Sequence, residues 1–312
     1  MISLVQLGTV DYATGLRLQQ QLVALRKEEK IGDVLLVLEH SPVITLGRNA
    51  KAANIIASPE LLAQRGVALF ETDRCGDVTF HGPGQIVGYP IFDLRGFTAS
   101  DGRRKTLGVI EFVRRLEEVL IRTCADFAIP TKRVPGLTGV WTDPQSPPSP
   151  ELSFRAEEND SQNRSLESRN LLSAGATTGH VGTAASAVQQ SEASAPDHRP
   201  EAKLAAIGVH ISRSVTSHGF ALNVNADLSY FSLIIPCGIT AKPVTSMQQE
   251  LGKSLDMNAV AESISRNFGT VFSSQMLWVD TLDALLGRTV GVPMKPPAEF
   301  RQIANEDEVN WA

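Results

Sequence analysis

The chain has 312 residues, of which 42% are hydrophobic and 20% are charged. These values are typical of a globular protein and exclude collagen, a long coiled coil and full-length disorder. A net charge of −5 gives no basic surplus for nucleic acid binding. No basic segment opens the chain, and no apolar run reaches the roughly 18 residues of a spanning helix. We therefore expect a cytoplasmic protein without nucleic acid or membrane partners.

The part of the chain before residue 144 is predicted to run in the order strand, helix, strands, helix. Strands are expected at residues 2–7, 34–38, 67–71, 78–80 and 86–92. Asp11 is a suitable cap for a helix that reaches about residue 30, and Ser58-Pro59 begins a short helix that ends before Gly66. A long helix follows, with one apolar stripe formed by Leu107, Ile110, Val113, Leu116, Leu120, Cys124 and Phe127.

Residues 144–200 interrupt this pattern. Of these 57 residues, 30 are Ser, Ala, Pro, Gly or Thr, so the segment has too few large apolar side chains to offset the entropy of ordering. We expect a disordered insertion that forms a passive surface loop. Beyond it, residues 203–211 and 215–224 indicate an antiparallel pair around a turn at 212–214, and residues 256–286 indicate one or two helices.

The strands occur in clusters and not in strict alternation with helices. This order predicts an α/β (α+β) protein with a mixed, largely antiparallel sheet on which helices pack.

Cys237 is the first candidate for chemistry. It follows an apolar run and lies between Pro236 and Gly238, which mark a sharp turn. A thiol held at such a turn could attack a substrate, and neighbouring backbone N–H groups could stabilise an oxyanion. A buried small apolar residue at a strand end explains the local pattern equally well.

Lys203 opens the apolar segment KLAAIGVHI directly after the insertion. A lysine beside a thiol favours the thiolate and can move protons. From this segment alone, an ordinary solvated lysine is the simpler interpretation.

The segment RCGDVTFHGPGQIVGYP, residues 74–90, is rich in glycine. It matches neither a Walker loop nor a dinucleotide fingerprint, and it indicates either close backbone approach to a ligand or a tight turn between strands. Cys124 lies on an apolar helix stripe and is expected in the core. The histidines lack metal-ligand spacing, and no G-x-S-x-G elbow is present.

Taken together, these segments resemble the lipoyl(octanoyl) transferase family. The matching stretches are LEHSPVITLGR (38–48), RCGDVTFHGPGQIVGYPIFDLR (74–95), GLTGVWTD (136–143), KLAAIGVHISRSVTSHGFALNVNADLSYFSLIIPCGI (203–239) and VTSM (244–247). The HGPGQ, KLAAIG and PCGI blocks in this order are jointly very specific. The resemblance covers about residues 1–250 apart from the insertion.

The resemblance implies a fold shared with biotin and lipoate protein ligases. It implies a catalytic domain formed by residues 1–143 and 201–250, with residues 251–312 as a helical segment packed on it. It also implies that octanoyl passes from the phosphopantetheine of acyl carrier protein to Cys237, and then to a lysine of a lipoyl domain. The acceptors would be lipoyl domains of 2-oxo acid dehydrogenase E2 subunits and the glycine cleavage H protein.

In this family Lys203 would lower the pKa of the cysteine and move protons. No metal or nucleotide cofactor is needed, because a thioester is already activated. The implied substrate pocket comprises Arg74, Cys75, Gly76, Asp77, Val78, Thr79, Phe80, His81, Ala206, Ile207, Gly208, Gly219, Phe220 and Ala221.

Two positions depart from the family pattern. Cys75 stands where the family usually has a second glycine, so it would be strained if that site requires positive φ. Phe80 replaces a common tyrosine and lacks one hydroxyl.

Three other functions remain open. An ATP-dependent lipoate or biotin protein ligase would need an adenylate site and no nucleophilic cysteine. A non-catalytic binder of lipoyl domains or acyl chains would need neither Lys203 nor Cys237. A cysteine hydrolase would release the acyl group as a free acid.

Overall fold

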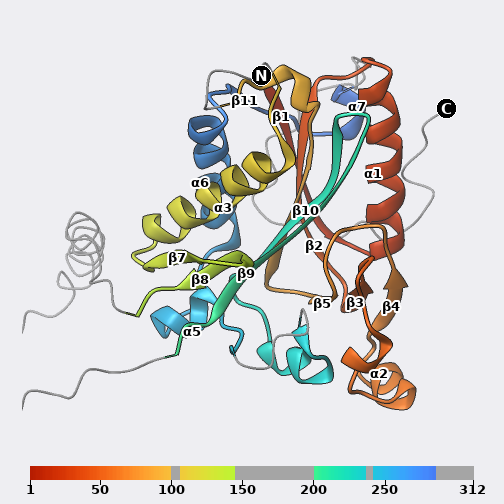
Figure 1. Ribbon diagram of the computed structural model, residues 1–312, viewed down its shortest axis with the longest axis vertical. Coiled ribbons are helices and arrows are strands. Elements are labelled where there is room, and N and C mark those ends of the chain that lie inside the picture. The colour runs from red at the N-terminus through yellow and green to blue at the C-terminus, as the bar shows by residue number, and fades with distance from the viewer. Residues whose placement is uncertain (100–105, 145–199, 237–241, 286–312) are drawn as a thin grey trace, which may run out of the picture.

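The computed structural model describes residues 1–99, 106–144, 200–236 and 242–285. A central eight-stranded sheet organises the molecule (Figure 1). Its strands, in sheet order, are β11 (Met276–Trp278), β1 (Ile2–Val10), β2 (Asp33–His40), β6 (Gln85–Ile91), β10 (Val215–Asn223), β9 (Lys203–Ser212), β8 (Leu137–Thr142) and β7 (Thr131–Val134).

The sheet is mixed and largely antiparallel, which confirms the predicted class. Only the β11–β1 and β1–β2 pairs are parallel. The five pairs from β2 to β7 are antiparallel. The predicted pair is therefore the β9–β10 ribbon, and the turn at its tip has positive φ at Arg213 and Ser214.

Helices cover both faces of this sheet (Figure 1). Helix α1 (Tyr12–Lys27) closes one apolar cluster, while α3 (Val109–Asp126) and α6 (Met257–Val271) close a larger cluster on the opposite face. The larger cluster includes packed aromatic rings of Phe92, Phe112, Phe268 and Phe272. Two short helices, α5 (Met247–Leu251) and α7 (Leu282–Leu285), complete the C-terminal part.

A smaller sheet lies beside the central one. It consists of β4 (Ala68–Glu71), β3 (Val43–Leu46) and β5 (Val78–His81), with α2 (Pro59–Gln64) nearby. The 3₁₀ helix η3 (Leu228–Leu233) packs on it through a third apolar cluster. Two further 3₁₀ turns, η1 (Ala52–Asn54) and η2 (Leu94–Gly96), lie in connections.

The predicted helix starts are confirmed by their capping contacts. Asp11 accepts a hydrogen bond from the Thr14 N–H, and Ser58 accepts one from the Leu61 N–H. Each side chain satisfies a backbone donor that lacks a partner in the first turn.

Several elements were not predicted. Strands β3, β7, β8 and β11 are short, and β7 and β11 lie at the sheet edges with half-buried or exposed residues. Their polar or brief sequences carry little alternation. The segment after residue 251 is therefore not wholly helical, because β11 joins the central sheet beside β1. Residues 286–312 lie outside the described part.

The ends of the predicted insertion meet in space. Strands β8 and β9 pair directly, and the Thr142 N–H donates to the Ala202 carbonyl. Residues 145–199 therefore connect neighbouring antiparallel strands, while the disorder expected of them concerns residues outside the described ranges.

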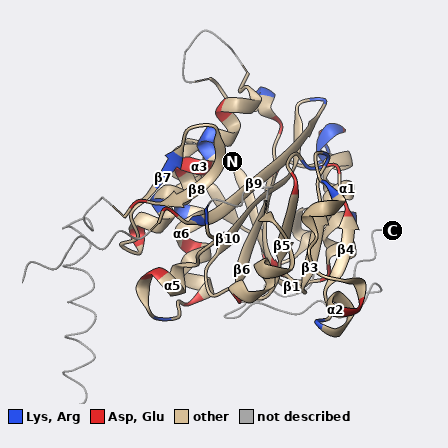
Figure 2. Ribbon diagram, turned by 60° about the horizontal axis from the view of Figure 1, so that its bottom comes forward, with Lys and Arg blue, Asp and Glu red and all other residues tan. Residues whose placement is uncertain are grey.

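Charged residues of both signs are interspersed along the chain, as on α3 (Figure 2). Ion pairs Arg114–Glu117, Arg115–Glu111 and Arg122–Glu118 join them there. Within the part of the chain that the structure describes, no helix combines the length and apolar character needed to cross a membrane.

The apolar stripe of α3 is correct except at Ile110. Leu116 is fully buried, whereas Ile110 is 79% exposed. We predict that Leu116→Ala lowers the free energy of unfolding by about 2–5 kcal/mol, because it leaves a cavity. The matched change Ile110→Ala should cost less than about 0.5 kcal/mol. Urea unfolding measures both, and equal effects would contradict this packing.

Candidate active site

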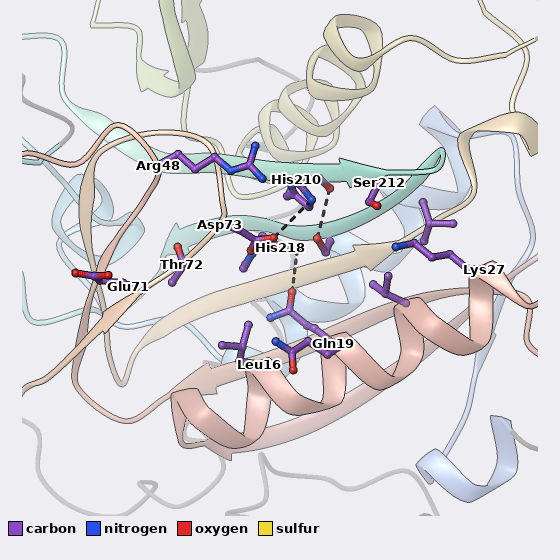
Figure 3. A pocket seen from close by; sticks show the side chains of 14 residues that line it. Leu16, Gln19, Lys27, Arg48, Glu71, Thr72, Asp73, His210, Ser212 and His218 are labelled. Carbon is purple, nitrogen blue, oxygen red and sulfur yellow. Dashed lines mark hydrogen bonds and ion pairs between the residues drawn. The ribbon is translucent and has the colours of Figure 1, made fainter.

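Three cavities lie in a row along the β9–β10 ribbon. The inner cavity is lined by Thr79, Gln85, Lys203, Ala205, Ala206, Ala221, Asn223, Phe231, Pro236 and Val244. The middle cleft is lined by Tyr12, Arg74, Cys75, Gly76, Thr79, His81, Val87, Tyr89, Ala206, Ile207, Gly208, His218, Gly219, Phe220 and Ala221. The outer groove, of about 730 Å³, lies between α1 and the ribbon (Figure 3).

Neighbouring cavities share walls. Thr79, Ala206 and Ala221 line both the inner cavity and the middle cleft. His218 lines both the middle cleft and the outer groove. The three spaces thus follow one direction along the ribbon.

Lys203 is the first residue of β9 and is buried in the wall of the inner cavity. Its Nζ lies 5.3 Å from the centroid of the Trp141 ring, within cation–π range. Gly139, at φ +125°, lies close to both β9 and this side chain, because a Cβ there would lie 2.5 Å from the Ala205 carbonyl oxygen and 3.0 Å from the lysine Cε. Local backbone geometry therefore directs an amine into a small, partly apolar space.

Cys237 lies outside the described residues, as do residues 238–241. The residues that flank this stretch lie at the cavity of Lys203. Pro236 and Val244 both line the inner cavity with Lys203. The Lys203 N–H donates to the Pro243 carbonyl, and the Thr245 N–H donates to the Lys203 carbonyl. Both ends of the segment that carries Cys237 are thus held at the cavity of Lys203.

Eleven of the fourteen residues expected in the substrate pocket line the middle cleft. Asp77, Val78 and Phe80 do not. On β5, Thr79 and His81 face the cleft, while Val78 and Phe80 pack in the apolar cluster beside η3. Successive side chains of a strand point to opposite faces, so consecutive residues of β5 cannot all line one pocket.

The position of Phe80 explains why its missing hydroxyl leaves the cleft unchanged. Its ring stacks on Tyr230 with centroids 4.7 Å apart. Asp77 instead supports the loop, since its side chain accepts hydrogen bonds from Asn54 and from the Val78 N–H.

Arg74 fastens the glycine-rich loop over the cleft. It is buried, and its guanidinium donates to the carbonyls of Thr45 and Asp77 at 2.7 and 2.6 Å. The loop touches β9 at Gly208, where a Cβ would lie only 2.7 Å from the Cys75 carbonyl oxygen. Glycine at 208 therefore permits the loop to close on the ribbon.

The concern about strain at Cys75 does not apply. Positive φ occurs at the next residue, Gly76, with φ +103°, and not at Cys75. Cys75 is exposed and lines the cleft. Cys124, in contrast, is a core residue as predicted, and burial raises the pKa of its thiol to about 12.

A polar network that the sequence did not predict forms the floor of the site. His81 Nδ1 contacts Gln85 Oε1 at 2.7 Å, and Gln85 Nε2 donates to Asn223 Oδ1. Asn223 in turn donates to the Thr245 carbonyl. The network ties the middle cleft to the segment beside Lys203. Gln85 lies in the HGPGQ block, and this block is the sequence signal that could have indicated the network.

Two buried histidines are neutral. Burial lowers the pKa of His40 to about 4 and that of His81 to about 3. His40 Nδ1 donates to the Val10 carbonyl at 2.8 Å, so its Nε2 accepts from the Tyr89 hydroxyl at 2.6 Å. These rings add no charge to the cleft. Among the described residues, no group of three or more His, Cys, Asp or Glu side chains could hold a metal ion.

Comparison with protein families gives one match that covers most of the chain. The family model of the lipoyl protein ligase A/B catalytic domain matches residues 11–269.

Two curated relatives are named octanoyltransferase. The protein of Koribacter versatilis (strain Ellin345) is 50% identical over 307 residues, which are 98% of this chain and 98% of the relative. The protein of Acidobacterium capsulatum is 46% identical over 288 residues, 92% of this chain and 96% of the relative.

Solved structures share the fold at low sequence identity. A bi-partite lipoate protein ligase of Thermoplasma acidophilum has a TM-score of 0.57 and 11% identity, covering 92% of this chain and 91% of its own. A lipoate-protein ligase A bound with ATP has a TM-score of 0.53 and 10% identity, and the match covers 92% of this chain and 93% of the ligase chain.

The neutral histidines predict a pH effect on stability. Their folded-state pKa values lie below the ordinary value of 6.5. Stability is therefore complete above pH 6.5 and falls on acidification, because only the unfolded chain takes up these protons. Below pH 6.5, each histidine lowers the free energy of unfolding by at most about 1.4 kcal/mol per pH unit. We predict a shallower fall between pH 7 and 5.5 in His40→Asn, measured by urea unfolding. Identical slopes in both proteins would contradict neutral burial of His40.

Proposed function

The chain belongs to the lipoyl protein ligase A/B catalytic domain family, and from this premise we propose that it moves octanoyl from acyl carrier protein to the lysine of a lipoyl domain through Cys237. Acyl transfer is its reaction class, since the relatives at 50% and 46% identity are octanoyltransferases.

One observation carries the role of Cys237. Pro236, to which Cys237 is bonded, lines the same cavity as Lys203, and so does Val244 beyond the segment. Cys237 is therefore covalently bonded to a residue of that cavity wall, and consecutive Cα atoms are only about 3.8 Å apart. Cys237 and Lys203 are 34 positions apart in the sequence, yet the fold brings the lysine to the base of the cysteine segment.

In the first step the Cys237 thiolate attacks the thioester carbonyl. A new carbon–sulfur bond forms to Cys237, and the bond to the phosphopantetheine sulfur breaks. The departing thiolate takes a proton and leaves as the carrier thiol. A nearby lysine ammonium favours the reactive thiolate, and thiol exchange between thioesters is close to balanced.

In the second step the lysine of the lipoyl domain attacks the acyl-enzyme. The acceptor ammonium must first lose a proton, for which Lys203 is the nearest candidate base or relay. A carbon–nitrogen bond forms, the carbon–sulfur bond breaks, and Cys237 recovers its proton. The amide product makes the transfer favourable.

The acyl chain occupies the middle cleft in this proposal. Its walls include Val87, Ile207, Phe220 and small residues of the ribbon. Each methylene buried there contributes about 0.8 kcal/mol. No metal or nucleotide takes part, because the donor thioester is already activated. The acceptors are lipoyl domains of E2 subunits or the H protein, and a reducing cytoplasm keeps Cys237 free.

Intact-protein mass tests this proposal. With octanoyl-acyl carrier protein, the wild type and the matched control Cys75→Ser should each gain one octanoyl group, which a lipoyl domain then removes. Cys237→Ser should gain none and lose at least about a thousandfold in rate. Lys203→Met should slow transfer by about a hundredfold or more, as expected for a lost acid–base group.

Other outcomes would contradict the proposal. An adduct that survives in Cys237→Ser but not in Cys75→Ser would identify Cys75 as the nucleophile. Lipoyl-domain modification only with ATP and free lipoate would indicate a ligase. Release of free octanoate without acceptor modification would indicate a hydrolase, and binding without any turnover would indicate a non-catalytic binder.

A further inference from the structure

His218 has an unusual backbone conformation for a residue within a strand of the ribbon. Its φ is +54°, a left-handed conformation that is uncommon outside glycine. The following even-numbered residues, Phe220 and Leu222, pack in the apolar cluster beneath α3 and α6. His218 instead directs its groups toward α1 and the glycine-rich loop, where its backbone N–H donates to Gln19 Oε1 at 2.8 Å.

Asp73 holds the imidazole in this position. His218 Nε2 lies 2.6 Å from Asp73 Oδ1, and the ring is almost fully buried. Figure 3 shows the pair between the β9–β10 ribbon and α1. Because His218 lines both the middle cleft and the outer groove, it lies where the two spaces meet.

The distance from the reacting end to this wall matches an eight-carbon chain. From Ala205, in the inner cavity, to Gly208, in the middle cleft, β9 advances by three residues, or about 10 Å. Seven zigzag carbon–carbon bonds of about 1.5 Å give an extended octanoyl chain a length of about 9 Å. With its carbonyl level with Ala205, in the inner cavity that Lys203 also lines, the chain would end at the level of the Gly208–Gly219 pair, one register position from His218.

We propose that the His218–Asp73 pair is the stop that sets acyl chain length in this enzyme, an inference that rests on the proposed function. A longer chain must displace the imidazole and enter the outer groove. That groove, of about 730 Å³, is far larger than the middle cleft of about 50 Å³, and its lining mixes Leu16, Val23 and Val215 with polar groups including Gln19, Arg48, Asp73 and His210. Methylenes beyond the stop therefore lose the factor of about four in binding that burial of each one provides, and they displace water from polar groups.

Substitution of His218 tests the stop. His218→Gly removes the ring and tolerates the positive φ, so it joins the cleft to the outer groove. We expect the ratio of kcat/KM for dodecanoyl- over octanoyl-acyl carrier protein to rise by about tenfold or more, with the same lipoyl domain as acceptor. The matched control is His210→Ala, because His210 also faces Asp73 at 3.5 Å but lines only the outer groove. It should keep the wild-type ratio.

A second variant keeps the test decisive if His218→Gly does not fold. Asp73→Ala leaves the imidazole but removes the group that holds it, and it should raise the same ratio by a smaller factor. Unchanged ratios in the folded variants, or an equal rise in His210→Ala, would overturn the stop. Failure of the proposed function is distinguishable, since the wild type would then transfer no octanoyl at all.

Discussion

The antiparallel register of β9 against β10 is the constraint on which the site depends. It sets Ala206 opposite Ala221 and Gly208 opposite Gly219. The two glycines permit close approach of neighbouring backbone, since a Cβ would lie 2.7 Å from the Cys75 carbonyl oxygen at Gly208 and 2.1 Å from the Gly88 carbonyl oxygen at Gly219. The same register places Lys203 at the start of β9 and sets His218 of β10 opposite Val209, farther along the ribbon. Main-chain hydrogen bonds of the ribbon therefore position Lys203 and the ribbon residues that line the middle cleft.

The loop that covers this ribbon is held by a buried cation and surrounded by neutral polar groups. The Arg74 guanidinium binds backbone carbonyls of two segments, so it fixes the loop through hydrogen bonds. His40 and His81 nearby are uncharged because burial disfavours their protonated forms. A cleft of this kind suits an acyl chain, since it offers apolar walls while its polar groups are satisfied by one another.

Much of this arrangement could be predicted from sequence. The long apolar alternation of β9 and β10 and the cap at Asp11 are local signals. The pocket predicted from sequence included every residue from 74 to 81. Side chains alternate between the two faces of β5, so Val78 and Phe80 point away from the cleft. No local sequence signal singles out His218, since the role proposed for it depends on a left-handed backbone and on Asp73, 145 positions earlier. The short edge strands β7 and β11 were missed because pairing with neighbours, and not their own sequence, makes them strands.

In the proposed binding mode the acyl chain lies along the ribbon, with its carbonyl in the cavity of Lys203 and its methyl end next to His218. An octanoyl thioester with a diazirine on its terminal carbon tests this most directly, followed by photolysis and peptide mass spectrometry, with octanoyl-acyl carrier protein as competitor. We expect labels on residues 217–219 or on the loop at 73–76, and octanoyl-acyl carrier protein should suppress them. Labels at Phe231 or Trp141, at the opposite end of the row of cavities, would contradict it.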